Sequence, residues 1–434
     1  MHIKEDLIIN RYNISDEKID TIKYIIETYL EKIDYFSCPE NKSISEEIGY
    51  LGVASELLSV VECDEYFYYV LFKIIKSIRD NIEIGNLRSI SLHEGLSNIG
   101  VFLTTIAENT GSYKKFLHEL NHLICITVEE QYKSYIFEGN ICTQNFDIIC
   151  GFSGVGNYLL HYSNDCEVQK ALQLICKYLV RITEYIYVEK KRFPGWYICP
   201  DNEHYLDAYA MYEGGYINYS VSHGSGGILL FLVNAYERGI LVEGLKDAIN
   251  RIVKEYVVVN SLGNGQWWAG IISKAAYGKG LLPNLSGRQS WCYGDISVLL
   301  ALYKSSKVLE LEQFEIKIYN ELTRIAKMDI KQYHLNSPII CHGYAGTLTI
   351  FRTLYEETNE PVFFDTMMRL LSFTLNSFNN NSLYGFRNVI SQTGISLVYN
   401  DDNSFLNGAS GIIMELLAWV KEKSYFESML LLKS

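Results

Sequence analysis

Two cysteines and a histidine in the second half of the chain stand at matching places in a repeated glycine motif. Cys292 lies two residues before Gly294, and Cys341 and His342 directly precede Gly343. Two thiolates and an imidazole are a typical zinc ligand set, and three protein ligands leave a fourth position open, as in catalytic zinc sites. Spacing alone leaves a second interpretation equally open, in which both cysteines are small buried hydrophobic residues.

The glycine motif that sets this register recurs seven times along the 434 residues and has the form G-x-x-[G/S/N]. The first glycines of the seven copies are Gly49, Gly95, Gly151, Gly224, Gly294, Gly343 and Gly408. Several copies are followed by strongly apolar segments, such as 228–236 (ILLFLVNAY), 298–303 (VLLALY) and 412–420 (IIMELLAWV). Such segments predict helices that are buried on most of their faces.

Segments of a second kind alternate with these apolar ones. In residues 17–33, Ile19, Ile22 and Ile26 form one apolar stripe, and charged residues lie elsewhere. The same pattern predicts half-exposed helices over 65–82, 113–133, 165–187, 242–258, 308–327 and 360–378.

Seven buried and seven half-exposed helices in alternation predict an all-α fold, an α/α toroid in which an inner ring of helices is enclosed by an outer one. A closed ring is favoured over an open solenoid because it needs no polar end caps. The glycine motif would place the N-terminus of every inner helix, with its free N–H groups, at one shared rim.

We expect this toroid to form a single domain over residues 1–434. Within it, residues 184–222 lose the helical period and gain aromatic and β-branched residues, which predicts a small β-rich insertion. Residues 259–290 are glycine-rich and irregular, and loops of this length in a compact fold are commonly functional or disordered.

Composition excludes several classes of protein. The 38 Lys and Arg residues against 51 Asp and Glu residues give a net charge of −13. This balance argues against a nucleic-acid binder, which needs clustered cations, but suits a cationic peptide. No apolar run reaches the roughly 18–20 residues of a membrane span, and the N-terminus lacks the apolar core of a secretory signal. Ten cysteines without short paired spacing favour a reducing cytosol, so we expect a cytoplasmic protein.

Other residues with useful chemistry precede the first glycine of other copies. They are His93 and Glu94, Cys150, and His223, which shares the register of His342. The register places them at the predicted rim. It does not decide whether His223 is a core, a supporting or a catalytic histidine.

The strings SHGSGG, GRQSWCYGD and CHGYAG resemble the signature motifs of the lanthionine synthetase C family, the zinc-dependent cyclases of lantibiotic biosynthesis. The resemblance covers the whole chain, because the sevenfold repeat and the length also match. It implies an α/α toroid with a small SH2-like insertion, for which 184–222 is the candidate. It also implies one zinc ion held by Cys292, Cys341 and His342.

The resemblance implies four catalytic residues: His223, Asp147 in FDIICG, and Arg288 and Tyr293 in GRQSWCYG. In the family reaction, a peptide cysteine thiol adds to dehydroalanine or dehydrobutyrine to form lanthionine or methyllanthionine. His223 would act as general acid or base, with Asp147 orienting it. Arg288 would stabilise the enolate oxygen, and Tyr293 would contact the enolate or His223. The residues alone favour simpler roles: a helix cap for Asp147, a core aromatic for Tyr293 and a loop salt bridge for Arg288.

The implied substrate is a dehydrated lantibiotic precursor peptide, and the implied partners are a dehydratase and an ABC transporter at the inner face of the cell membrane. Three other functions stay open. The first is the addition of a small thiol such as glutathione to dehydroamino acids. The second is zinc-dependent prenyl transfer, although no diphosphate-binding motif is present. The third is a non-catalytic peptide-binding scaffold in which zinc is structural.

Overall fold

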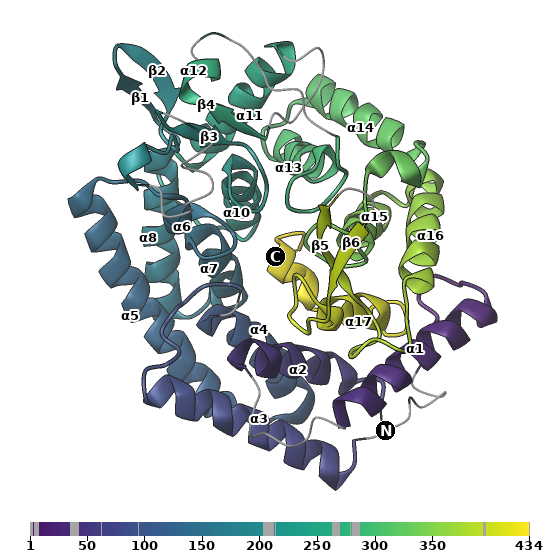
Figure 1. The fold of residues 1–434 in the computed structure, drawn as a ribbon. Helices are drawn as coiled ribbons and strands as arrows, with labels where there is room; N and C mark the ends of the chain where they lie inside the picture. The colour runs from purple at the N-terminus through teal and green to yellow at the C-terminus, as the bar shows by residue number, and fades with distance from the viewer. Residues whose placement is uncertain are drawn as a thin grey trace. The chain divides into compact units, whose positions relative to one another are not determined.

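The computed structural model describes residues 3, 8–34, 43–61, 63–93, 95–202, 212, 214–262, 270–277, 279, 287–393 and 396–433. Contacts divide the chain into two compact units. The first comprises Met1–Ser89, His93–His118 and Leu335–Glu427, and the second Ile90–Leu92, Glu119–His334 and Ser428–Ser434. Both are mostly helical (Figure 1). No helix in the described ranges combines the length and apolar character that a membrane crossing requires.

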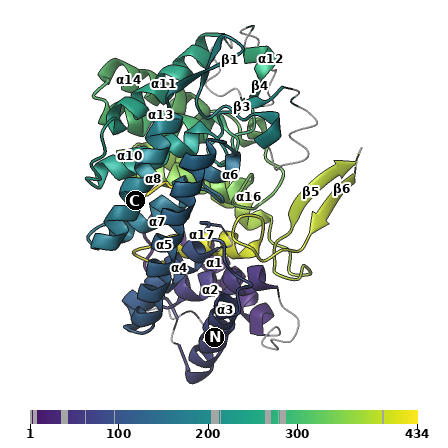
Figure 2. The same cartoon turned by 90° about the vertical axis from the view of Figure 1, so that its left-hand side faces the viewer.

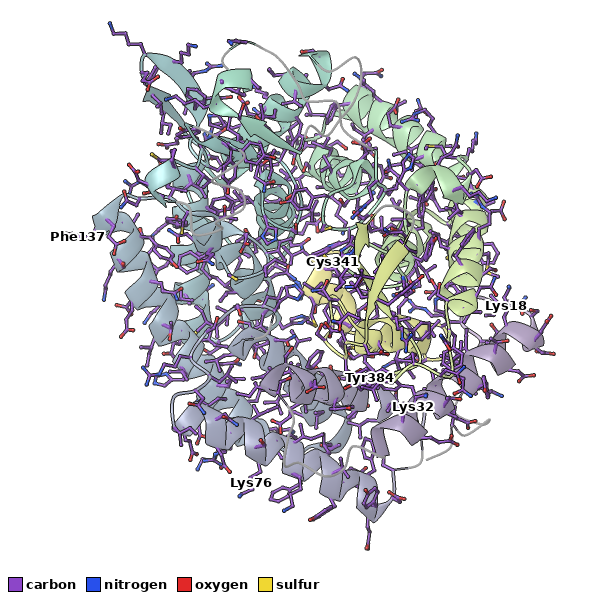
Figure 3. The ribbon with its side chains drawn as sticks, in the orientation of Figure 1. Lys18, Lys32, Lys76, Phe137, Cys341 and Tyr384 are labelled. Carbon is purple, nitrogen blue, oxygen red and sulfur yellow. The ribbon has the colours of Figure 1, made fainter. Side chains whose placement is uncertain are left out.

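In the first unit, four largely buried helices pack in the order α4, α2, α17 and α15. Their bounds are α2 (Ile44–Leu57), α4 (Leu96–Thr110), α15 (Tyr344–Thr358) and α17 (Ala409–Leu417). Amphipathic helices cover them: α1 (Asp16–Asp34) packs on α17, α3 (Glu65–Glu83) on α2, and α16 (Pro361–Asn376) on α15. Lys32, labelled in Figure 3, lies near the end of α1. Its ammonium donates to the carbonyls of Asn380 and Ser382.

In the second unit, the buried helix α10 (Ser225–Glu237) packs against α7 (Phe152–Leu159) and α13 (Asp295–Val308). The helices α8 (Cys166–Ile182), α11 (Leu245–Leu262) and α14 (Glu312–Ala326) cover α7, α10 and α13 in turn. Helix α5 (Lys114–Glu138) begins in the first unit and ends in the second. The shorter elements are α6 (Thr143–Phe146), η3 (Leu160–Tyr162), η4 (Pro200–Asn202), α12 (Lys274–Tyr277) and η5 (Ile330–Tyr333). The described chain thus contains the seven buried and seven amphipathic helices that the sequence predicts.

Short strands occur where the sequence loses its helical period. β1 (Tyr185–Val188) pairs with β2 (Lys191–Pro194), and β3 (Tyr216–Asn218) pairs with β4 (Ile271–Ser273), both antiparallel. The strand that pairs with β3 therefore comes from the glycine-rich stretch 259–290, and within 184–222 Ile198 adds an isolated antiparallel bridge to Tyr216. Residues 203–211 and 213, and much of 263–286, lie outside the described residues. The SH2-like character of 184–222 stays a prediction.

A third pair of strands lies between α16 and α17 and was not predicted from the sequence. β5 (Asn388–Thr393) and β6 (Ser396–Asn400) form an antiparallel hairpin with a register shift between Val389 and Ser391. Figure 2 shows it extending away from the helices of its own unit. At its base, the Ser337 hydroxyl donates to the Asn388 side chain at 3.0 Å. The hairpin is thereby tied to the loop that leads to Cys341.

The first glycine of the motif is the N-cap residue of six inner helices, as predicted. These are Gly95, Gly151, Gly224, Gly294, Gly343 and Gly408. The prediction was wrong for Gly49, which lies inside α2. Ser43 and Glu46 form a capping box that starts this helix at Ile44. Reciprocal capping of two backbone N–H groups outweighs the glycine as a helix start here.

The last glycine of the motif lets an inner helix lie directly on the loop that precedes it in the chain, called here its entry loop. A Cβ atom at Gly346 would overlap the backbone carbonyl of Ile340, and one at Gly411 would overlap that of Phe405. Gly154 is placed in the same way. The obstructing carbonyl belongs each time to the sixth residue before the glycine. Only glycine allows this approach, so the motif fixes each entry loop against its helix.

Replacing Gly346 with alanine should lower the free energy of unfolding by about 1–3 kcal/mol, because the added methyl group overpacks a rigid backbone contact. Chemical denaturation followed by circular dichroism measures the change. Gly287→Ala is the matched control, since a Cβ atom there would meet its nearest neighbour at 3.8 Å, an ordinary contact. Equal losses of stability in the two variants would contradict the close-approach argument.

Candidate functional site

Backbone hydrogen bonds join neighbouring entry loops. In the second unit, the N–H of Ile148 donates to the carbonyl of Ser222 at 3.1 Å, and the N–H of Ser222 donates to the carbonyl of Cys292 at 3.3 Å. In the first unit, the N–H of Cys341 donates to the carbonyl of Leu406 at 2.9 Å. All of these residues except Ile148 lie two positions before the first glycine of their motif. Residues at the same position relative to the first glycine in the sequence are therefore the ones whose backbones pair between neighbouring loops.

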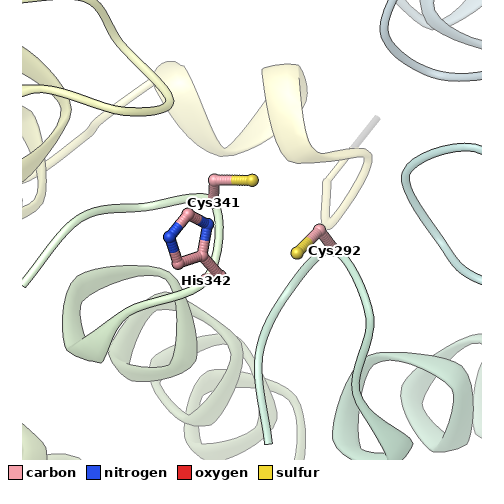
Figure 4. A group of neighbouring side chains, drawn as sticks. All are labelled: Cys292, Cys341 and His342. Carbon is pink, nitrogen blue, oxygen red and sulfur yellow. The ribbon is translucent and has the colours of Figure 1, made fainter. Parts of the chain in front are cut away.

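Cys292, Cys341 and His342 offer three ligand atoms that all lie within 4.8 Å of one another (Figure 4). Cys292 is buried, and the other two side chains are half-buried. In a tetrahedral zinc site with zinc–sulfur bonds of about 2.3 Å, ligand atoms lie roughly 3.3–3.8 Å apart, so small side-chain adjustments suffice. Among the described residues, no other three His, Cys, Asp or Glu side chains come together in this way. Two soft sulfurs and one imidazole fit zinc and leave its fourth position open.

Asp147 and His223 form a pair in the second unit. Nδ1 of His223 lies 2.7 Å from Oδ2 of Asp147, which is fully buried, whereas the imidazole is 28% exposed. The other carboxylate oxygen accepts from the backbone N–H groups of Cys150 and Gly151, both at 2.8 Å. One oxygen thus supports the start of α7, and the other fixes the imidazole. Nε2 of His223 faces away from the carboxylate and is the atom that can exchange a proton with a substrate.

Tyr293 lies beside His223, with the two ring centroids 6.3 Å apart. Its hydroxyl accepts a hydrogen bond from the amide of Asn218 at 3.0 Å. Burial raises the pKa of Tyr293 to about 12, so the hydroxyl keeps its proton at neutral pH. In the same loop, the Ser220 hydroxyl accepts from the backbone N–H of His223 at 3.1 Å. Asn218 and Ser220 were not predicted, because the register comparison used only the two residues before each glycine.

Arg288 lies half-buried in the loop before Cys292. Within the part of the chain that the structure describes, its guanidinium has no hydrogen-bond or ion-pair partner, so the loop salt bridge is not formed there. No hydrogen bond or ion pair in these ranges joins it to the other predicted site residues. Of the unassigned rim residues, His93 stacks on Phe405 in the first unit, with centroids 5.8 Å apart, and Glu94 lies outside the described residues.

The chain belongs to the lanthionine synthetase C-like protein family, which it matches over residues 39–431. It is 26% identical over 356 residues to the nisin biosynthesis protein NisC of Lactococcus lactis subsp. lactis, covering 81% of this chain and 77% of that protein. The solved structure of nisin cyclase matches with a TM-score of 0.76 and 22% identity, covering 95% of this chain and 98% of that one. This likeness confirms the predicted α/α toroid fold.

Proposed function

We propose that this chain is a zinc-dependent lantibiotic cyclase that closes thioether rings in a dehydrated precursor peptide. The observation that carries the proposal is the backbone bond between Ser222 and Cys292. This bond supports the proposal because it joins the loop that carries His223 to the loop that carries Cys292. Proton transfer by the Asp147–His223 pair and thiol binding at the candidate ligand group would then occur at neighbouring loops. Family membership and the similarity to NisC support peptide cyclisation as the reaction.

In the proposed reaction, a cysteine thiol adds across the double bond of dehydroalanine or dehydrobutyrine in the same peptide. The S–H bond breaks, a bond forms between sulfur and the β-carbon, and a proton is delivered to the α-carbon. The mass of the peptide is unchanged. Zinc held by Cys292, Cys341 and His342 would supply an open position and a positive charge that favour the thiolate, which is scarce for a free thiol with a pKa of about 8.5.

The other residues handle protons and charge. His223 takes up the thiol proton at Nε2 and delivers a proton to the α-carbon, while Asp147 holds the imidazole in one orientation and stabilises its charged form. Negative charge develops on the amide oxygen next to the α-carbon when sulfur attacks. Arg288, a permanent cation, would donate hydrogen bonds to this oxygen, and the neutral Tyr293 hydroxyl would supply a second donor beside His223.

Asp147→Asn should slow ring formation by about 10²–10⁴-fold, because the imidazole loses its anionic partner. The asparagine Oδ1 can still accept from Cys150 and Gly151, so the fold should be retained. Initial rates of ring formation and the midpoint of chemical denaturation measure the two effects separately. Ring formation at the unaltered rate would show that the carboxylate only supports α7.

The proposed activity is tested by incubating the purified protein with a peptide that carries one dehydroalanine or dehydrobutyrine and one free cysteine. Thiol alkylation followed by mass spectrometry should show an unchanged peptide mass and the loss of the alkylatable thiol. A parallel reaction contains glutathione. A peptide whose mass rises by one glutathione would favour small-thiol addition instead, and peptide binding without either product would favour the scaffold.

The proposed reaction also implies partners. Dehydroamino acids are made by eliminating water from serine or threonine, so a dehydratase must act on the peptide first. We place the enzyme in the cytoplasm, at the inner face of the membrane, with that dehydratase and an ABC transporter that exports the product. The net charge of −13 would attract a cationic peptide.

A further inference from the structure

Residues 428–432 form a segment that is buried throughout. Residues 428–430 belong to the short helix η6 (Phe426–Leu430), and residues 431 and 432 follow it. Ser428 is the most exposed of residues 428–432, at 4%. Buried backbone carbonyls need hydrogen-bond donors. The donors to these carbonyls therefore show which elements hold the segment in place.

Three inner helices of the second unit supply donors to these carbonyls. Asn157 of α7 donates to Ser428 at 2.7 Å, and Asn234 of α10 donates to Leu431 at 3.1 Å. Lys304 of α13 is also buried, and its ammonium donates a hydrogen bond to the carbonyl of Leu432 at 2.7 Å. The segment is thus fixed to all three inner helices of its unit. The three donors are polar side chains on helices that are otherwise largely apolar and buried.

A fourth donor comes from the entry loop of α13. The indole Nε1 of Trp291, a fully buried residue, donates to the carbonyl of Leu430 at 3.2 Å. Trp291 directly precedes Cys292. The carbonyl of Cys292 in turn accepts from the N–H groups of Val221 and Ser222 at 3.2 and 3.3 Å. The backbone of the cysteine is therefore held by the neighbouring loop, and its preceding residue is held by the C-terminal segment.

We propose that the C-terminal segment 428–432 positions the Cys292 thiolate for metal binding, and that Trp291 is the positioning residue through which it acts. The inference rests on the zinc site of the proposed function. A metal site binds tightly only when its ligands are held near the required geometry, and partners outside the ligand set change metal affinity by about 10–100-fold. The bond from Trp291 to Leu430 fixes the Cys292 loop to a segment that is itself anchored on three helices.

Trp291→Phe tests the inference, because it keeps an aromatic ring and removes the N–H donor. Competition with a chromophoric zinc chelator should show a zinc dissociation constant raised about tenfold. Trp419→Phe is the matched control: Trp419 is also fully buried and donates its indole N–H to Glu415 at 3.1 Å, within the first unit. This control loses an equivalent buried hydrogen bond, and its zinc affinity should stay unchanged.

A second variant removes a hydrogen bond at the other end of the segment, at Leu432. Lys304→Met keeps the aliphatic stem and removes the donor to the Leu432 carbonyl, and it should weaken zinc binding in the same direction but by less. Unchanged affinity in Trp291→Phe, or an equal loss in Trp419→Phe, would overturn the positioning role while leaving the zinc site intact. Failure of the unaltered chain to bind zinc would instead overturn the proposed function together with this inference.

Discussion

Cys341→Ala should abolish zinc binding and ring formation together. The substitution removes one of two thiolates, and the remaining thiolate and imidazole form only half of a tetrahedral shell. Metal analysis of the purified variant should show close to no zinc, against one ion per chain in the unaltered protein. The alkylation assay on the same sample should leave the peptide thiol fully reactive.

Cys176→Ala is the control for a lost cysteine. Cys176 lies fully buried on α8, and burial raises the pKa of its thiol to about 12, so it stays protonated and unsuited to metal binding. This variant should keep its zinc and its activity. Full zinc content in Cys341→Ala would contradict the ligand assignment. Zinc loss in both variants would point to a general loss of structure instead.

His223→Ala should separate metal binding from catalysis. The imidazole is paired with Asp147 and belongs to no metal-ligand group among the described residues, so zinc content should stay at one ion per chain. Ring formation should slow by about 10²–10⁴-fold, the usual effect of removing a general acid or base. Rates from the alkylation assay and metal analysis on the same preparation test both statements.

His161→Ala is the corresponding control. Burial lowers the pKa of His161 to about 4, with Arg238 acting in the same direction, so this histidine is neutral at pH 7 and remains so in a proton-transfer assay. Its loss should leave the rate of ring formation unchanged. A normal rate in His223→Ala would remove this residue from the mechanism, whereas zinc loss in that variant would mean that it helps to hold the metal.

The helical part of the fold could be predicted because its determinants are local and repeated. The apolar segment after each glycine and the amphipathic segment between copies report burial directly through their composition. The one misplaced helix start, at Gly49, had a local cause as well, since Ser43 and Glu46 form a capping box ahead of it. The capping box of these two residues, rather than the glycine motif, sets the start of the helix.

The strands were harder to predict because their pairing is not local. β3 finds its partner β4 more than fifty residues along the chain, and neither strand is long enough to carry a clear alternating pattern. The β5–β6 hairpin has β-branched residues, but it lies between two helices of an otherwise helical repeat.

The residues of the candidate site were proposed from sequence, but their geometry was not accessible to it. The resemblance implies Asp147 and His223, yet only the fold brings these residues, 76 positions apart, to 2.7 Å. The bond from Trp291 to Leu430 joins residues 139 positions apart and has no signature in either local sequence. Spacing within a repeat reveals which positions share a rim, and packing decides which of them touch.

The central claim is that two sulfurs and one imidazole of this chain hold a zinc ion. X-ray absorption at the zinc edge on the purified protein tests it most directly. We predict two sulfur neighbours at about 2.3 Å and nitrogen or oxygen neighbours at about 2.0–2.1 Å, with one zinc per chain. A zinc shell of nitrogen and oxygen alone, or a purified protein without zinc, would contradict the claim.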